Sequence, residues 1–145
     1  METNSRLGES LRLCMAIAKA HATLARRFDG RLGTWHGLSF GDLIVLWHVD
    51  RAPDGRLRRV DLAAQLGVTA SAVTRTLIPL EKIGLVARRP DPHDARVGYA
   101  VLTRAGQRVL QEALESAEMI SREVVPNDSG QLANLHKLLT TLSAG

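Results

Sequence analysis

The 145-residue chain predicts a mainly α fold with one small β-hairpin. Apolar residues recur every three or four positions near both ends of the sequence, which is the spacing of amphipathic helices. Between these ends, residues 57–103 follow the order helix, turn, helix, strand, basic loop and strand. That order is the outline of a winged helix-turn-helix with helices on both sides of it.

Two helices are predicted before this segment. The first covers roughly residues 7–28, and Gly30 and Gly33 are expected to interrupt it. Ser39 is expected to cap the second helix, because a serine hydroxyl accepts from the free N–H groups at a helix start. Residues 52–55, with a proline and a glycine, are expected to end that helix as a turn.

Small residues lie where the two helices of the helix-turn-helix must approach each other. Ala63 allows the approach, and Gly67 can take the left-handed conformation that the turn requires. Thr69 is expected to cap the second helix of the motif with its hydroxyl. That helix is expected to bury one apolar side, formed by Val73, Leu77, Leu80 and Ile83.

The opposite face of this helix carries side chains that suit contacts with DNA. Arg75 can donate to both acceptors on a guanine edge, while the hydroxyls of Ser71 and Thr74 can reach phosphates or bases. For Ser71 and Thr74 the alternative is an ordinary exposed helix surface. Thr69, Ser71, Thr74 and Arg75 are the DNA-binding candidates of the motif.

The predicted hairpin pairs residues 85–89 with residues 98–102. Arg88 and Arg89 are neighbours in a strand, so they point to opposite faces and only one is expected to touch phosphate. Both remain DNA-binding candidates.

The loop of the hairpin, residues 90–96, contains two prolines, two acids and one arginine. Asp94 is expected to stabilise this wing by pairing with Arg96, while Arg96 extends toward the negative potential of the minor groove. The alternative is an ion pair that stabilises the turn and has no role in DNA binding.

Two further helices are predicted after the hairpin. Thr103 is expected to cap a long helix, residues 126–130 to break it, and a leucine-rich helix to follow. The apolar faces of the terminal helices have no evident core in so small a domain, so a two-fold dimer is expected. We therefore expect a helical dimerisation region at residues 1–34 and 104–145, with the winged helix-turn-helix at residues 35–103, in one compact unit.

The positive charge is concentrated in the middle of the chain. Residues 56–108 hold ten basic and four acidic side chains, a net of +6 within a total of +4. The remaining residues hold nine basic and eleven acidic side chains. Clustered positive charge is what a protein needs to neutralise DNA phosphates, so this pattern favours double-stranded DNA as a partner.

Composition limits the other classes of function. No apolar run approaches the roughly 20 residues of a membrane span, and the first six residues lack the features of a secretory signal. A single cysteine fits a reducing compartment, so a cytoplasmic protein without membrane partners is expected. The sequence contains no phosphate loop, paired carboxylates or nucleophile–base set, so neither an enzyme nor a cofactor is expected.

Taken together, these segments resemble the MarR family of dimeric winged-helix transcription regulators. The resemblance covers nearly the whole chain and is carried by residues 61–67, 71–77, 80–86, 89–96 and 102–106. It implies that the terminal helices form a homodimer, that the second motif helix enters the major groove and that Arg96 enters the minor groove. Many members have a further arginine at the position of Ala95, so sparser wing contacts are expected here. The resemblance also implies a small aromatic or anionic effector, bound between the dimerisation helices and the winged domain, that releases DNA.

Three other groups of residues were weighed as sites. Trp35 and His36, expected on a loop, are candidates for the effector pocket, whereas Trp47 is expected in the core. Cys14 is a redox candidate, although Leu11 and Met15 beside it favour a buried, inert thiol. The five histidines show no metal-ligand spacing, so no metal is expected.

The sequence thus predicts a DNA-binding transcription regulator, a dimeric repressor that a small molecule releases from an inverted-repeat operator. Two alternatives stay open: a redox-responsive regulator that senses through Cys14, and a winged-helix module that binds protein instead of DNA.

Overall fold

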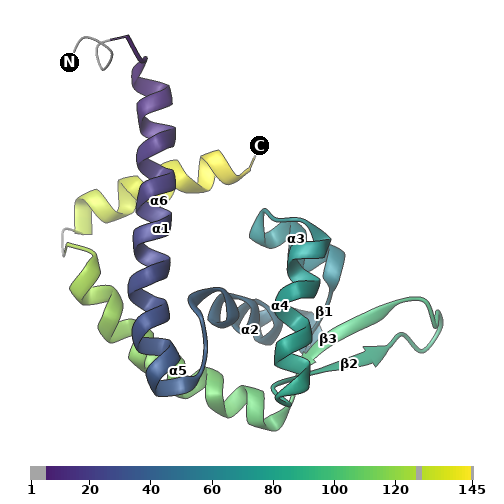
Figure 1. Cartoon of the computed structure of the whole chain (residues 1–145). Helices are drawn as coiled ribbons and strands as arrows, with labels where there is room; N and C mark the ends of the chain where they lie inside the picture. The colour runs from purple at the N-terminus through teal and green to yellow at the C-terminus, as the bar shows by residue number, and fades with distance from the viewer. Residues whose placement is uncertain (1–5, 127–128, 145) are drawn as a thin grey trace.

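The computed structural model describes residues 6–126 and 129–144. It is mainly helical with one three-stranded sheet, so the predicted fold class is confirmed (Figure 1). The elements in chain order are α1 (Glu9–His36), α2 (Phe40–Arg51), a 3₁₀ turn (Pro53–Gly55), β1 (Arg56–Arg58), α3 (Arg59–Leu66), α4 (Ala70–Lys82), β2 (Val86–Pro90), β3 (Gly98–Leu102), α5 (Arg104–Val124) and α6 (Ser129–Ser143).

The hydrophobic core lies around α2, which is packed by α1, α3, α4, α5 and the sheet. Leu46 and Val49 of α2 are completely buried, as are Leu62 of α3, Leu77 of α4 and Leu110 of α5. The wing projects away from this body, and α5 crosses the lower part of α1 (Figure 1). The core therefore fixes the position of the helix-turn-helix relative to the long helices.

Three helices begin at the hydroxyl caps expected from the sequence. Ser39 and Asp42 form a reciprocal capping box, Thr69 accepts from the N–H of Ala72 at 3.1 Å, and Thr103 accepts from that of Gly106 at 3.0 Å. Gly67 ends α3 in the left-handed conformation, with φ of +68°. These local predictions are confirmed.

The sheet has the order β1–β3–β2, and all neighbours are antiparallel. The hairpin register pairs Val86 with Leu102 and Arg88 with Ala100. β2 therefore begins and ends one residue later than the predicted strand 85–89, while β3 covers the predicted residues 98–102. The prediction that the motif's first helix begins at Leu57 is wrong: Leu57 is buried in β1 and paired with Ala100, and α3 begins at Arg59. Pairing with a strand some forty residues later outweighs the local preference of this short segment.

Two further predictions on the helices are wrong. The first helix runs through Gly30 and Gly33 to His36, because burial of Leu32 outweighs the roughly 1 kcal/mol that each glycine costs a helix. Ile83 is 62% exposed, since the chain leaves α4 at this residue and turns at Gly84, which has φ of +80°.

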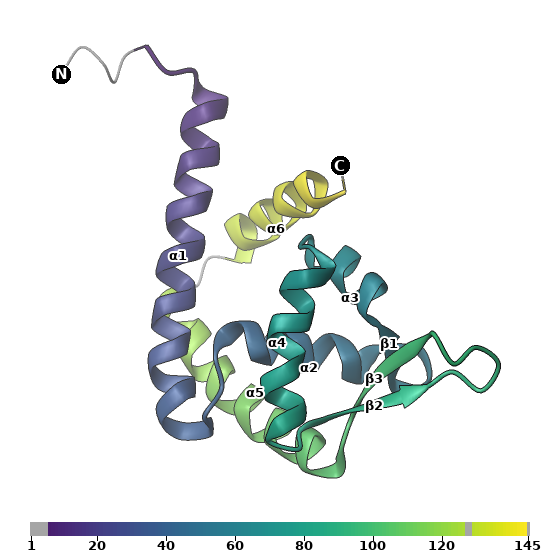
Figure 2. The same cartoon turned by 45° about the vertical axis from the view of Figure 1, so that its right-hand side comes forward.

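The N-terminal half of α1 and the whole of α6 extend beyond the body of the chain (Figure 2). Both carry exposed leucines, such as Leu11 and Leu135 at 50% and 54% exposure. The predicted helix break covers residues 126–130, of which residues 127 and 128 lie outside the described residues. Residues 1–5, on which the expected lack of a secretory signal partly rests, also lie outside them. Among the helices of the described residues, none combines the length and apolar character that a membrane span needs.

The start of α5 touches the backbone at the start of the hairpin. A Cβ atom at Gly106 would lie 2.0 Å from the carbonyl oxygen of Leu85, which is far inside contact distance. Around this contact, the Thr103 N–H donates to the Leu85 carbonyl at 3.0 Å and the Thr103 hydroxyl donates to that of Gly84 at 2.6 Å. Glycine at 106 is therefore required by close packing.

Replacing Gly106 by Ala is expected to lower the free energy of unfolding by about 2 kcal/mol or more, because backbone atoms have to move to make room for the methyl group. Urea denaturation followed by circular dichroism at fixed protein concentration measures this change. Gly30→Ala is the matched control: it meets nothing within 4 Å and is expected to stabilise α1 by roughly 0.5–1 kcal/mol. Equal stability of the Gly106→Ala variant and the wild type would contradict the packing argument.

Candidate DNA interface

The first turns of α4 present the predicted contact residues on the side away from the core. Ser71 and Arg75 are exposed, while Val73 and Leu77 on the other side are buried. Thr69 is occupied as the N-cap, so its hydroxyl positions the helix start. The exposed face at the start of α4 is thus formed by Ser71 and Arg75.

Thr74 differs from its neighbours because it is half-buried and already has a partner. Its hydroxyl accepts from Nη1 of Arg59 at 3.4 Å, and Nη2 of Arg59 lies 3.5 Å from the Glu81 carboxylate. Arg59 thereby joins the start of α3 to α4. The sequence analysis missed this residue, although the basic pair Arg58–Arg59 at the helix start was a visible signal.

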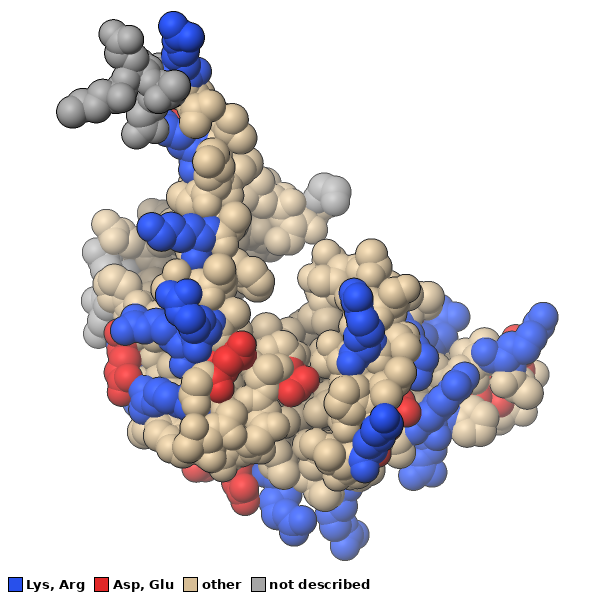
Figure 3. Space-filling view, in the orientation of Figure 1, with Lys and Arg blue, Asp and Glu red and all other residues tan. Residues whose placement is uncertain are grey.

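A hollow of about 290 Å³ lies between α3, α4 and the wing. Its walls carry four arginines and one acid, and the lining residues are Arg58, Arg59, Val60, Glu81, Arg88, Arg96, Val97, Gly98, Tyr99 and Ala100. Figure 3 shows basic side chains spread over this right-hand part of the molecule, with few acidic ones between them. Arginine offers only donors, so the hollow suits anionic oxygens such as phosphates.

The two strand arginines point to opposite faces, as expected from their adjacency. Arg88 shares a face with Ala100 and lines the hollow, whereas Arg89 is paired with Tyr99 on the other face. The Arg88 side chain lies across Gly98, where a Cβ atom would be 2.4 Å from its Nε. Of the two arginines, Arg88 is therefore the one directed to the α4 side of the wing.

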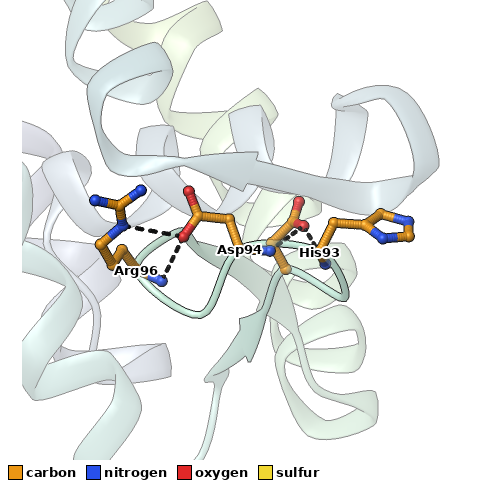
Figure 4. Close-up of polar contacts among 4 residues, drawn as sticks. His93, Asp94 and Arg96 are labelled. Carbon is orange, nitrogen blue, oxygen red and sulfur yellow. Dashed lines mark hydrogen bonds and ion pairs between the residues drawn. The ribbon is translucent and has the colours of Figure 1, made fainter.

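Asp94 holds Arg96 in the wing loop. One carboxylate oxygen of Asp94 accepts from the Arg96 backbone N–H at 3.0 Å and from its Nε at 3.2 Å (Figure 4). The guanidinium is otherwise 92% exposed, so the bond fixes the base of the side chain and leaves its end free. The His93 ring points away from this cluster.

Asp91 organises the same loop and was missed by the sequence analysis. Its carboxylate accepts from the backbone N–H groups of His93 at 2.7 Å and Asp94 at 3.1 Å, and from the Tyr99 hydroxyl at 3.0 Å. The bond from the His93 N–H, followed by that from Tyr99, lowers the pKa of Asp91 below its ordinary value. An Asx turn was a foreseeable role for this aspartate, but its bond to Tyr99 depends on the hairpin register.

Arg58 is held beside the helix start in the same way. Its Nε donates to the Asp61 carboxylate at 2.9 Å, and this bond raises the pKa of Arg58. Arg56, on the same strand, lies over the Tyr99 ring at 4.5 Å. Both arginines are thus positioned by neighbours at the edge of the hairpin.

A second cavity, of about 420 Å³, lies between α1, α2 and α5. Its walls are largely apolar and consist of Phe28, Phe40, Leu43, Ile44, Trp47, His48, Leu114, Ala117, Glu118 and Ser121. Trp47 is therefore not a core residue as predicted: it is 40% exposed and lines this cavity. Apolar residues are spread evenly around α2, so the sequence does not indicate which side of this helix is left uncovered by other elements.

Neither Trp35 nor His36 is among these lining residues. The prediction that they lie on a loop is wrong, because both belong to the last turn of α1. Trp35 is exposed beside Arg31, and Nε2 of His36 lies 2.7 Å from the Ser116 hydroxyl of α5. His36 thus joins α1 to α5, and neither residue lines the hollow beside the wing or the cavity between α1, α2 and α5.

Cys14 lies on the N-terminal half of α1 and is exposed in the single chain, contrary to the expectation of a buried thiol. The residues beside it, Leu11 and Met15, are also exposed. Within residues 6–126 and 129–144, no three His, Cys, Asp or Glu side chains come together in a way that could hold a metal ion.

Comparison with known proteins agrees with this architecture. A family model described as the MarR family matches residues 36–97, which extend from the end of α1 to the wing loop. The chain is 32% identical over 108 residues to the HTH-type transcriptional regulator FarR of Neisseria gonorrhoeae, covering 68% of this chain and 74% of FarR. It is also 30% identical over 89 residues to the HTH-type transcriptional regulator YdgJ of Bacillus subtilis, covering 61% of this chain and only 51% of YdgJ.

Among solved structures, Sco3205, a MarR family transcriptional regulator from Streptomyces coelicolor in complex with DNA, has a TM-score of 0.84. Its identity is 25%, and the match covers 94% of this chain and 88% of that chain. The winged helix-turn-helix, the long flanking helices and these similarities lead to one assignment. The chain belongs to the MarR family of winged-helix transcriptional regulators.

Proposed function

We propose that the protein is a homodimeric repressor that binds an inverted-repeat operator and leaves it when a small molecule binds. The observation that carries this proposal is the arginine-lined hollow between α3, the last turn of α4 and the wing, together with the exposed Ser71 and Arg75 in the first turns of α4. A helix start that fits the major groove and a concentration of donors for phosphate lie on the same side of the molecule. A surface for protein binding would not need so many arginines around one hollow.

In this proposal the contacts divide into base reading and backbone positioning. Arg75 and Ser71 read base edges in the major groove, and Arg96 enters the neighbouring minor groove. Arg88 contacts phosphate from within the hollow, while Thr69 and Thr74 hold the start of α4 in place. Arg89 lies on the opposite face of the hairpin, so its share in binding is smaller.

Dimerisation follows from the unpartnered apolar faces of the terminal helices. Leu11 and Met15 of α1 and Leu135 and Leu139 of α6 are all exposed in the single chain. Exposed leucines at helical spacing on two projecting helices are typical of an interface between copies. Two copies would place two α4 helices against successive major grooves of an inverted repeat.

The cavity between α1, α2 and α5 is the effector site in this proposal. It joins the helices that form the dimer to the helix on which the winged domain is packed. One of its lining residues, His48, is hydrogen-bonded to Gln65 of α3 at 3.1 Å. A ligand that moves α2 therefore also moves the helix-turn-helix.

Fluorescence anisotropy of the purified protein against duplexes that tile the DNA upstream of its own gene tests the proposal. Excess nonspecific competitor and a series of salt concentrations separate specific from general binding. Tight binding to one tile, weakening steeply with salt, is the expected result. Uniform weak binding to every tile would contradict the proposal and favour a protein partner.

Replacing Arg75 by Ala is expected to cost roughly 1–3 kcal/mol of operator binding and to relax sequence preference, because a base contact is lost. Arg96→Ala is expected to weaken specific and nonspecific duplexes alike. Competition anisotropy with operator variants distinguishes the two patterns, and Arg89→Ala is the control on the opposite face of the hairpin. Wild-type affinity of both Arg75→Ala and Arg96→Ala would rule out this interface.

Replacing Asp91 by Ala is expected to loosen the wing loop and lower operator affinity several-fold, since three hydrogen bonds to one carboxylate disappear. Hydrogen exchange of the wing amides, with His93→Ala as control, measures the loosening. The pKa of Asp91 is lowered by folding, so its contribution is fully present above the ordinary pKa of 3.8 and is lost as pH falls through the lower folded value. Wing protection that is unchanged in Asp91→Ala would contradict this role.

Replacing Leu135 and Leu139 together by Glu is expected to give a monomer, because charges would be buried in the interface between copies. Analytical ultracentrifugation measures the mass, and anisotropy is expected to show at least tenfold weaker operator binding once the second half-site is lost. Lys137→Glu changes a polar position of the same helix and serves as control. A dimeric Leu135→Glu, Leu139→Glu variant would show that α6 is not the interface.

A further inference from the structure

The cavity between α1, α2 and α5 has few polar groups. Four of its lining residues carry polar side-chain atoms: Trp47, His48, Glu118 and Ser121. The remaining walls are aliphatic or aromatic, including Phe28 and Phe40. The charge and hydrogen-bonding capacity of these four groups therefore decide which ligands fit.

Trp47 contributes a donor, its indole N–H, whereas the other three groups contribute acceptors. The Ser121 hydroxyl donates its hydrogen to the Glu118 carbonyl at 2.7 Å, so only its lone pairs remain. Nδ1 of His48 lies 3.1 Å from Oε1 of Gln65, and since that oxygen only accepts, Nδ1 donates to it; a neutral imidazole in this tautomer has Nε2 as its acceptor. A carboxylate such as Glu118 accepts with both oxygens.

Glu118 also sets the charge of the cavity. It is the only acidic residue in the lining, which contains neither lysine nor arginine. In the part of the chain that the structure describes, no basic side chain pairs with Glu118. Its charge is therefore available to a bound molecule, whereas an anion placed here would be repelled by Glu118 and would find a neutral donor in the Trp47 indole N–H.

The aromatic walls favour the same class of ligand. Trp47 already has the guanidinium of Arg51 over its ring at 5.3 Å, although Arg51 itself does not line the cavity. Aromatic faces attract cations through their quadrupole, and they also stack with other rings. A flat aromatic molecule with a protonated amine satisfies both the walls and the acceptors.

We propose that this cavity binds aromatic amines in their cationic form and rejects aromatic carboxylates and phenolates. This inference rests on the proposed effector site and narrows the small aromatic or anionic effector expected from the family resemblance. It is carried by the acceptors of His48 and Ser121, the unpaired carboxylate of Glu118 and the aromatic walls.

Isothermal titration calorimetry of the full chain tests the proposal with three probes that share an indole ring. Tryptamine is cationic, indole-3-propionate is anionic and 3-methylindole is neutral. Tryptamine is expected to bind at least about tenfold more tightly than indole-3-propionate, as charge-assisted hydrogen bonds imply. Glu118→Gln is expected to remove most of that preference while leaving the affinity for 3-methylindole unchanged.

Glu115→Gln is the matched control, because Glu115 is exposed on α5 and does not line the cavity. The proposal is overturned if indole-3-propionate binds as tightly as tryptamine, if Glu118→Gln keeps the preference, or if no probe binds at millimolar concentration. Release of operator DNA is measured separately by anisotropy. Tryptamine that binds in the cavity without weakening operator binding would confirm the ligand class and contradict the proposed effector role.

Discussion

The contact between the start of α5 and the backbone of Leu85 is the constraint on which the rest of the winged domain depends. The chain leaves α4 at the Gly84 turn, runs out and back through the hairpin, and returns to Leu85 at Thr103. Thr103 binds the carbonyls on either side of the turn and caps α5 at the same time. Both ends of the wing and the end of α4 are thereby fixed to the long helix, and only glycine at 106 lets the backbones come this close. Any movement of α5 is consequently transmitted to the wing and α4 together.

Neighbouring side chains position the arginines of the hollow. Arg59 is shared between Thr74 and Glu81, and Arg96 is tethered by its Nε while its outer nitrogens stay in solvent. Solvent-exposed ion pairs of this kind contribute little to folding stability. These ion pairs matter more for binding, because a side chain that is already oriented would lose less conformational freedom on contact with a phosphate.

Local chemistry explains which features the sequence predicts well. The caps at Ser39 and Thr69 and the left-handed Gly67 each depend on neighbours within a few residues, and all were predictable. Features that depend on distant partners were not: β1 exists because Leu57 pairs with Ala100, and α1 passes Gly30 and Gly33 because Leu32 is buried. Trp47 was assigned to the core because apolar residues surround α2 on every side, and only the packed structure shows that a cavity lies against it. Among the proposed contact residues, residue type alone points to Arg75 and Arg96, whereas Asp91 and Arg59 act through contacts across the hairpin or between helices.

The two cavities have opposite chemistry, and this difference bears on how a ligand would act. The hollow beside α4 is lined by four arginines and one glutamate, whereas the cavity between α1, α2 and α5 is lined by one glutamate and by neither lysine nor arginine. An anionic aromatic compound would be drawn to the arginines and would compete with DNA directly for the same donors. A cationic aromatic compound is repelled there and attracted by Glu118, so its effect on DNA has to pass through α2 and the His48–Gln65 bond. Competition and allostery are therefore separable by ligand charge. A competing ligand is displaced completely when the DNA concentration is raised. An allosteric ligand lowers the DNA affinity by a fixed factor, and once the ligand site is saturated more ligand does not change that factor.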